Sequence, residues 1–238
     1  MSDLSIRLAA LREPAPTGIL PGVFERTGLA HHFVVRPSPL GPVFVAYSRR
    51  GITLVDLAPG PADFAARYSS RFARPVLPVE EPPARLATGL ERALAAGRTG
   101  KLPLDLAGVG SFQEAVLRKA AEIPRGEVRP YGWVAAEIGR PGSSRAVGNA
   151  LATNPVPLVV PCHRVVRADG RLGRYSLGAD ENKRRLLRAE GFDVETHEHL
   201  ATRGVRYLGS STTRIYCHPS CRHANRITHR HRVEFRDV

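Results

Sequence analysis

The sequence predicts a mixed α/β protein whose first part is rich in strands and whose second part is mainly helical. Short β-branched runs near the N-terminus are separated by turn signals, whereas later segments carry apolar residues at helical spacing. The chain has 238 residues, of which 42% are hydrophobic, so it is long enough for one large or two modest domains. This apolar content argues against a disordered chain.

The first part of the chain reads as a leader followed by an antiparallel meander. Residues 1–28 are rich in Pro and Gly, and β-branched and aromatic runs follow at 33–35, 43–46 and 52–55. Pro-Leu-Gly-Pro and Arg-Arg-Gly between these runs are turn signals. We therefore predict a leader over the first 28 residues and an N-terminal α/β domain at 29–107.

Two helices complete this predicted domain. Apolar residues recur every four positions within residues 61–73 and again within 83–96, so each segment presents one apolar helical face. Residues 74–84 hold four prolines and no periodicity, which predicts an extended connection between the helices.

The second part begins with a helix at Ser111. Ser111 and Glu114 form a capping-box pattern, and Pro124 ends the apolar periodicity. Short helices are predicted at 130–139 and 143–153, joined by Arg-Pro-Gly. This pattern is compatible with a helix-turn-helix, but on its own it favours an ordinary helical hairpin.

An apolar strand is predicted at 158–160, directly before Cys162, and a last helix at 179–190. We assign these elements to a C-terminal domain at 108–195. The remaining residues, 196–238, form a tail.

The formal net charge of +13 predicts a polyanionic partner, although only three of the 35 cations are lysines, a skew that base composition also produces. The last 38 residues hold eight arginines against two acids, so the tail is the densest basic segment. No apolar run approaches the ~18 residues of a membrane span. No secretion signal is recognised and three cysteines make no paired disulfide framework, so we expect a soluble cytoplasmic protein.

Cys162 is the candidate nucleophile. A lone cysteine beside an apolar strand is usually a buried small hydrophobe. Here His163 and Arg164 follow it directly, and such neighbours stabilise a thiolate. His163 is also a base of suitable intrinsic pKa, and Glu190 is a candidate to orient it.

The segment 154–165, Asn-Pro-Val-Pro-Leu-Val-Val-Pro-Cys-His-Arg-Val, resembles the active-site signature of the O6-alkylguanine-DNA alkyltransferases, or methylated-DNA–protein-cysteine methyltransferases. Flanking motifs agree with this family, including Ser-Arg-Ala-Val-Gly-Asn-Ala at 144–150 and Leu-Leu-Arg-Ala-Glu-Gly at 186–191. The resemblance covers about residues 32–192. It implies a small ribonuclease-H-like N-terminal domain and a C-terminal domain with a winged-helix-like helix-turn-helix.

The resemblance also implies the reaction, which is DNA repair by alkyl transfer. Cys162 would take a methyl or alkyl group from O6 of guanine, and also from O4 of thymine, in duplex DNA after base flipping. His163 would act through a water as the base, Glu190 would orient His163, and Asn154 would hold the turn before the cysteine. Each molecule would react once, and the transfer would need no cofactor.

The resemblance assigns DNA contacts to the second short helix. Arg145 would fill the space left by the flipped base, although a solvated surface arginine is the default without the motif. Tyr131 would crowd the target phosphate and assist the leaving guanine. The remaining matched DNA-binding residues are Ser144, Ala146 and Gly148. The pocket residues are Tyr131, Val165, Tyr175 and Ser176.

The tail resembles the first half of the metal-binding module of Ada-type adaptive-response proteins. Cys217 and Cys221 match the first cysteine pair of its zinc site, but the second pair is missing. Four ligands are normal for structural zinc, and four tail histidines are the candidate substitutes. The tail is thus either a truncated remnant or a working zinc site, and its arginines would attract phosphates.

The predicted partner is double-stranded DNA that contains O6-alkylguanine, with no membrane, and the expected state is a monomer. The alternatives are a non-catalytic alkylated-DNA-binding protein and an adaptive-response regulatory protein. The cysteine argues against the first, because that class lacks it. The incomplete ligand set of the tail argues against the second.

Overall fold

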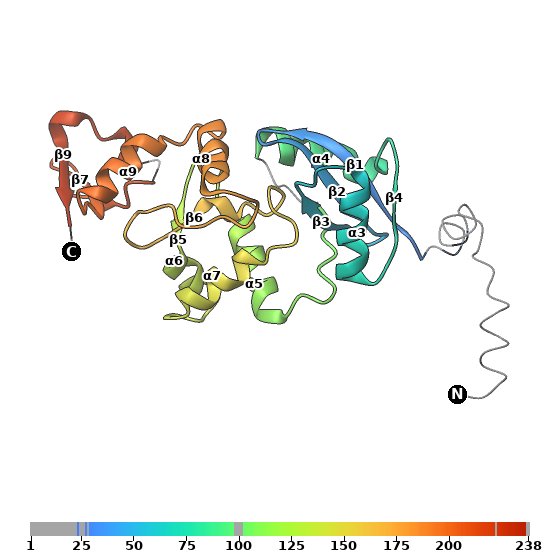
Figure 1. The fold of residues 1–238 in the computed structure, drawn as a ribbon. Coiled ribbons are helices and arrows are strands. Elements are labelled where there is room, and N and C mark those ends of the chain that lie inside the picture. Colours follow the sequence, from blue (N-terminus) through green and yellow to red (C-terminus); the bar gives the residue numbers. More distant parts are fainter. Residues whose placement is uncertain (1–22, 24–26, 28, 98–101, 222, 237–238) are drawn as a thin grey trace, which may run out of the picture.

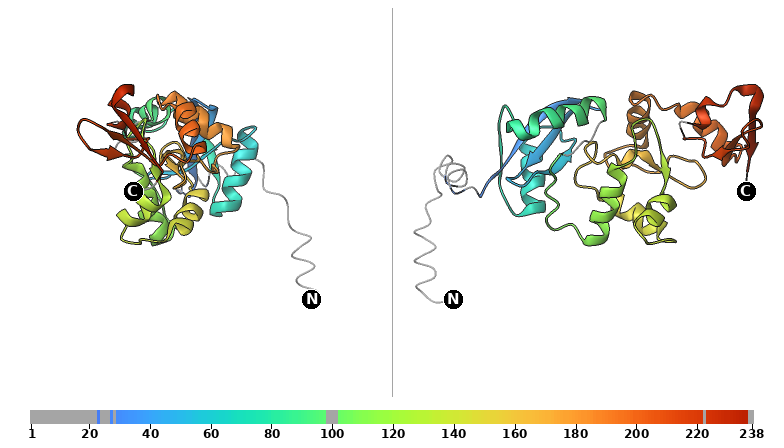
Figure 2. Two further views of the ribbon diagram at one scale, coloured as in Figure 1. Left: turned by 90° about the vertical axis from the view of Figure 1, so that its left-hand side faces the viewer. Right: turned by 180° about the vertical axis from the view of Figure 1, so that it is seen from behind.

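The structure is a computed structural model that describes residues 23, 27, 29–97, 102–221 and 223–236. It is a mixed α/β fold in which three units follow one another along the chain. Figure 1 and Figure 2 show a strand-rich N-terminal unit, a helical unit in the middle and a small tail unit at the opposite end. The predicted leader lies outside the described residues except at positions 23 and 27.

The N-terminal unit is built on a four-stranded sheet in the order β3-β2-β1-β4. The predicted meander is confirmed, because β2 pairs antiparallel with both β1 and β3. β4 was not predicted. It lies in the supposed extended connection and pairs parallel with β1. The strands are β1 (His31–Ser38), β2 (Gly41–Tyr47), β3 (Ile52–Asp56) and β4 (Val76–Pro78).

Both predicted helices form, and they cover opposite faces of the sheet. They are α3 (Pro61–Phe72) and α4 (Ala84–Ala96). Phe64 and Tyr68 of α3 pack with Phe33 and Phe44, whereas the leucines of α4 pack with the alternate strand residues, such as Val34. Successive strand residues point to opposite faces, so the sheet is buried on both sides. The α4 face is continuous with the core of the helical unit.

The helical unit holds α5 (Ser111–Ala121), α6 (Tyr131–Glu137), α7 (Ser144–Ala152) and α8 (Asp180–Ala189). Two-residue strands β5 (Arg129–Pro130) and β6 (Val165–Val166) pair in parallel. The capping-box interpretation of Ser111 and Glu114 is wrong. Gly110 is the N-cap without a side-chain bond, and the Glu114 carboxylate instead accepts from Arg118 at 2.6 Å.

The predicted strand at 158–160 is also wrong, because these residues form turns. Leu158 has a φ of 71°, and only Pro157 and Val160 form an isolated bridge. Prolines at 155, 157 and 161 lack the N–H groups that a strand needs. Hydrogen bonds from one asparagine side chain hold the segment instead, as described below.

The tail forms a compact unit. α9 (Val194–Thr202) begins at Asp193, whose side chain accepts from Thr196 N. A three-stranded antiparallel sheet follows in the order β8-β7-β9. Its strands are β7 (Tyr207–Ser210), β8 (Tyr216–Cys217) and β9 (Arg232–Phe235). Among the described residues, no helix is long and apolar enough to cross a membrane.

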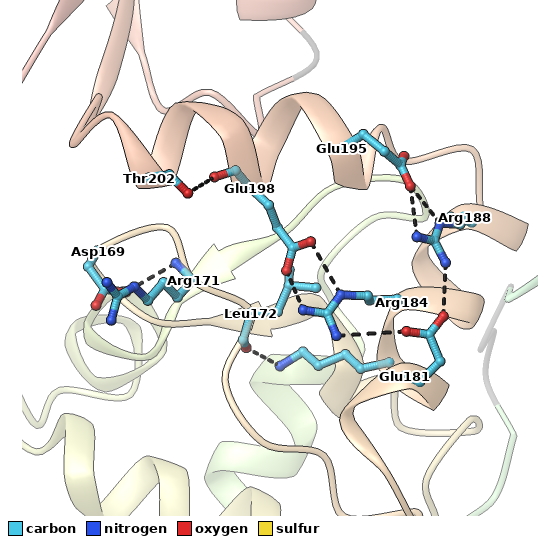
Figure 3. Close-up of polar contacts among 10 residues, drawn as sticks. Asp169, Arg171, Leu172, Glu181, Arg184, Arg188, Glu195, Glu198 and Thr202 are labelled. Carbon is cyan, nitrogen blue, oxygen red and sulfur yellow. Dashed lines mark hydrogen bonds and ion pairs between the residues drawn. The ribbon is translucent and has the colours of Figure 1, made fainter.

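Ion pairs fasten α9 to α8, as Figure 3 shows. The Arg184 guanidinium lies 2.7 Å from Glu198, and Arg188 lies between Glu181 at 3.0 Å and Glu195 at 2.8 Å. These side chains are about one-third to two-thirds exposed, so solvent screens the ion pairs and each contributes little to stability. The network therefore fixes orientation more than it stabilises the fold.

Candidate active site

Cys162 lies in an open groove of about 940 Å³. The groove is lined by α6, α7 and the loop at 167–176, with Cys162 from the short 3₁₀ helix η1 (Cys162–Arg164). Residues far apart in the sequence thus meet here. Among the residues predicted for DNA binding or the substrate pocket, the groove contains Tyr131, Ser144, Arg145, Gly148, Tyr175 and Ser176.

Asn154 holds the segment that presents Cys162. Its amide Nδ2 donates to Val160 O at 3.1 Å and to Cys162 Sγ at 3.3 Å, while its Oδ1 accepts from Val156 N at 3.0 Å. One buried side chain therefore supplies the hydrogen bonds that the proline-rich turn cannot make for itself. The expected positioning role of Asn154 fits this geometry.

The sulfur of Cys162 is buried but has polar neighbours. Ser176 Oγ lies 3.5 Å from it, on the side of the pocket loop. Burial raises the pKa of the Cys162 thiol, and hydrogen bonds from Ser176 and Asn154 with the charge of Lys183 partly offset this. A neutral thiol is therefore the resting state, and a nearby base is needed to form the thiolate.

His163 is paired with Glu190 inside the protein. His163 Nε2 lies 2.9 Å from Glu190 Oε1, and their side chains are only 2% and 7% exposed. Burial lowers the pKa of His163, so the neutral ring prevails near pH 7. Because an ionised carboxylate can only accept, Nε2 carries the proton and Nδ1 keeps a lone pair. Nδ1 is buried and has no hydrogen-bond partner among the described residues.

Arg164 holds the carboxylate of Glu190 from the other side. Its Nε and Nη2 donate to Glu190 at 2.9 and 2.7 Å, and its Nη1 donates to Ile123 O at 2.6 Å. Nη2 also donates to Gly97 O at the end of α4, so this arginine joins the N-terminal unit to the site. Burial raises the pKa of Glu190, but the bonds from His163 and Arg164 outweigh it and lower the pKa to about 2.

Lys183 is a second buried cation that the sequence did not single out. Its ammonium donates to Val165 O at 2.7 Å and to Leu172 O at 2.6 Å, which ties the residue after η1 to the pocket loop. Burial lowers the pKa of Lys183 to about 8, and the nearby Cys162 raises it. The available signal was composition, since Lys183 is one of three lysines in an arginine-rich chain.

Helix α7 presents small residues and one arginine to solvent. Arg145 and Ala146 are exposed, and Gly148 lies under Tyr131 with room for a Cβ at 3.9 Å from the ring. Burial raises the pKa of Tyr131, so its hydroxyl keeps its proton at neutral pH. Val165 differs from the other predicted pocket residues, because its side chain is buried in the main core and does not line the groove.

Arg164 was expected to stabilise a thiolate at Cys162, but its guanidinium holds Glu190 instead. Arg167 and Arg174 were not proposed as site residues, yet both line the groove. Arg167 and Arg174 are exposed. Their position in a loop that follows the Cys-His-Arg motif was the signal that could have identified them.

The tail cysteines lie close together but do not complete a zinc site. Cys217 and Cys221 interact with each other and pack on the same small apolar cluster. Among the residues that the structure describes, no group of three or more His, Cys, Asp or Glu side chains is placed so that it could hold a metal ion. A four-ligand zinc site therefore does not fit this arrangement.

The chain is similar to known DNA alkyltransferases. The family model described as 6-O-methylguanine DNA methyltransferase, DNA binding domain, matches residues 111–192. A methylated-DNA–protein-cysteine methyltransferase of Methanosarcina acetivorans is 37% identical over 162 residues, which is 67% of this chain and 98% of the relative. The corresponding protein of Methanosarcina barkeri is 35% identical over 156 residues, 63% of this chain and 90% of that protein.

A solved structure shows the same likeness. The crystal structure of Mycobacterium tuberculosis OGT in complex with DNA aligns with a TM-score of 0.55 at 32% identity. The alignment covers 70% of this chain and 99% of the solved chain. The groove around Cys162 lies within the region matched by the family model.

Proposed function

Because the chain belongs to the methylated-DNA–protein-cysteine methyltransferase family, it is a DNA-repair alkyltransferase, and we propose that Cys162 is its alkyl acceptor. The observation that carries this assignment is the position of the thiol. Cys162 lies at a groove beside Arg145 and Tyr131, with His163 next to it and held by Glu190. The substrate is the O6-alkylguanine of duplex DNA.

Proton transfer precedes the displacement. The thiol of Cys162 loses its proton to Nδ1 of the neutral His163, through a water as in the family. Glu190 and the Nε2–H bond keep the ring in the tautomer that leaves Nδ1 free, and the carboxylate stabilises the imidazolium that results. Asn154 Nδ2 and Ser176 Oγ donate to the developing thiolate.

The displacement then exchanges one bond for another. The sulfur attacks the alkyl carbon, the S–C bond forms, and the bond between that carbon and O6 breaks. The electron pair stays on the guanine, which takes up a proton with the help of the Tyr131 hydroxyl. The thioether has no easy return path, so each molecule reacts once. The thiol is both nucleophile and final acceptor, and the transfer requires no cofactor.

Access to O6 explains the arrangement of α6 and α7. The target atom lies within the base stack, so the nucleotide must be flipped out of the duplex. We assign α6 and α7 to a winged-helix-like helix-turn-helix, with Arg145 filling the vacated space. The exposed Ala146 and the uncrowded Gly148 support a close approach of α7 to the minor groove.

We further propose a ribonuclease-H-like N-terminal domain at 29–107, a C-terminal domain at 108–195, repair of O4-alkylthymine and a cytoplasmic location. The four-stranded sheet with helices on both faces supports the first of them. A non-catalytic role in binding alkylated DNA is disfavoured by the Cys162, His163 and Glu190 arrangement, which such a role does not need.

Mass spectrometry tests the assignment directly. Incubation with an oligonucleotide that contains O6-methylguanine is expected to add one methyl group to the peptide with Cys162, and none to those with Cys217 and Cys221. Cys162→Ala is expected to bind the same duplex and to transfer nothing. Stoichiometric binding by the unaltered chain without methylation of Cys162 would reject the proposal.

A further inference from the structure

A second cavity, of about 640 Å³, lies in the N-terminal unit and shares no lining residue with the Cys162 groove. It opens where β1, the β2–β3 turn, the end of α3 and the start of α4 meet. This volume falls in the range of roughly 300–1,000 Å³ that is typical of small-molecule sites. Its charged lining consists of the four arginines Arg49, Arg50, Arg74 and Arg85 and the single carboxylate Asp105.

The cationic groups of this cavity are largely without partners. The guanidinium groups of Arg49 and Arg74 make no ion pair or hydrogen bond among the described residues, and that of Arg85 donates only to Ser48 O at 3.2 Å. By contrast, Arg36 and Arg67 elsewhere in this unit are paired with carboxylates at 2.5 and 3.1 Å.

The single carboxylate does not neutralise the cavity. Asp105 accepts from Ser48 Oγ at 2.6 Å and lies 3.5 Å from Arg50 Nε. Its charge is therefore shared with only one of the four arginines. With neutral histidines, the lining keeps a formal charge of 4 − 1 = +3.

The inner wall of the cavity is polar and ordered. His31 Nδ1 lies 2.5 Å from the Tyr68 hydroxyl, which in turn lies 2.9 Å from Thr53 Oγ1. The other ring nitrogen of His31 has no hydrogen bond among the described residues. Burial and then the charge of Arg74 lower the pKa of His31, and His32 and Arg50 act in the same direction against Asp105.

The start of α4 adds to the positive field. Pro83 caps this 13-residue helix without a side-chain hydrogen bond, and the first turn contains no acidic residue. Both Pro83 and Arg85 line the cavity. The N-terminal end of a helix carries a partial positive charge and favours anions.

We propose that this cavity binds a small phosphate-bearing anion, held by Arg49, Arg74 and Arg85. The planar fork of a guanidinium matches the oxygens of phosphate, and several arginines around one recess suit a group with two or more charges. A recess of this size accepts a pyrophosphate or a nucleotide. The proposal concerns a site apart from the transfer reaction, and it does not depend on the role of Cys162.

Calorimetric titration of the full chain with inorganic pyrophosphate, at fixed ionic strength, tests the proposal. Saturable binding is expected. The double variant Arg74→Gln with Arg85→Gln is expected to weaken it about tenfold or more, since bonds to charged groups are the strong ones. The matched control is Arg67→Gln with Arg92→Gln, which removes two charges from the same unit outside the cavity. Its affinity should stay within about twofold of the unaltered chain.

Two further measurements locate the bound anion. Pyrophosphate is expected to raise the pKa of His31 in an NMR titration, and Arg145→Ala, in the other groove, is expected to leave pyrophosphate affinity unchanged. Thermal melting of both double variants checks that they fold. The single variant Arg49→Gln, which changes a third arginine of the cavity, is also expected to weaken pyrophosphate binding.

Several results would overturn the assignment. The first is the absence of saturable binding up to about 10 mM pyrophosphate, a concentration above the dissociation constants of ordinary weak ligands. The others are an equal loss of pyrophosphate affinity in both double variants, and a loss of pyrophosphate binding in Arg145→Ala. Undamaged duplex DNA separates the two sources of phosphate. One outcome is that the cavity variants bind duplex DNA less tightly while the unaltered chain does not bind pyrophosphate. In that case the phosphate comes from the DNA backbone, and the small-ligand proposal is rejected.

Discussion

Nε2 of His163 lies 2.9 Å from Oε1 of Glu190, and Arg164 donates two hydrogen bonds to the same carboxylate. The base of the proposed reaction is thus oriented by a carboxylate that is itself fixed by a buried cation. This arrangement both stabilises the fold and positions the proposed base.

The carboxylate of Glu190 should be needed both for the stability of the fold and for the rate of alkyl transfer. Glu190→Gln leaves the buried Arg164 without its counter-charge, so we expect a loss of roughly 3–5 kcal/mol in the free energy of unfolding. The single-turnover transfer rate should fall by about tenfold or more, because His163 loses its orienting partner. Urea unfolding and rapid-quench kinetics measure the two effects.

Glu195→Gln is the matched control for that variant. Glu195 is an exposed carboxylate that pairs with Arg188 and does not line the groove. It should leave stability and transfer rate nearly unchanged. A similar response of both variants would contradict the special role of Glu190.

Stability should fall steeply at acid pH. The pKa of Glu190 is lowered to about 2 in the folded chain, against 4.5 ordinarily, which corresponds to about 3 kcal/mol. A carboxyl whose folded pKa is depressed contributes fully above its unfolded value. That contribution should disappear between about pH 5 and pH 2. Urea midpoints measured across this range test it, and Glu190→Gln should have a flatter acid limb.

Arg145 should act on transfer and leave the fold intact. Arg145→Ala removes an exposed side chain, so its melting temperature should match that of the unaltered chain. The rate of transfer from duplex DNA should drop about tenfold or more, because in the proposed mechanism Arg145 fills the space left by the flipped base. Arg118→Ala, on α5 and outside the groove, controls for loss of positive charge. Equal rates for the two variants would reject the role of Arg145.

Gly148 offers a test in which stability and DNA binding move in opposite directions. A Cβ there would meet only the Tyr131 ring at 3.9 Å, an ordinary contact. Gly148→Ala should therefore stabilise the helix by up to about 1 kcal/mol. The substitution should weaken duplex binding several-fold, because the added methyl group keeps α7 from the floor of the DNA minor groove. Unfolding and fluorescence anisotropy give the two values, and unchanged affinity would exclude this close approach.

The tail should contain no structural zinc. Among the described residues, no third ligand lies with Cys217 and Cys221, so purified protein should hold far less than one zinc per chain by elemental analysis. A chelator should leave its melting curve unchanged. One tightly bound zinc per chain, lost together with stability in Cys217→Ser, would show a ligand set that this arrangement does not reveal.

Apolar spacing and turn signals predicted the helices and the antiparallel strand pairs of the N-terminal unit, because these elements depend on residues that are close in the sequence. The apolar spacing within 61–73 and 83–96 gave both helices of the N-terminal unit, and the turn signals gave its antiparallel pairs. β4 was not predicted because its partner residues in β1 lie 45 positions away and its own sequence is short and proline-rich.

The site was predictable only in part for a similar reason. The Cys-His-Arg motif marked the proposed nucleophile and its neighbours, and the resemblance supplied the roles proposed for Asn154 and Glu190. Residues 158–160 form a turn where a strand was expected, and hydrogen bonds of the Asn154 side chain hold this segment. An apolar pattern carries no information about such side-chain bonds. The cavity around Arg74 and Arg85 draws on segments spread over some eighty residues, so it becomes visible only once the chain has folded.

The contacts between the tail and the pocket loop have an entropic consequence. Arg206 of the tail donates to Ala168 O, and Gly170 lies so close to Ala201 of α9 that a Cβ would come within 2.9 Å of its methyl group. One end of the loop that lines the groove is thereby restrained before any DNA arrives. Ordering a loop costs conformational entropy, and here part of the loop is already ordered by its contacts in the folded chain. The tail thereby lowers the conformational entropy that this loop still has to lose when the groove is occupied.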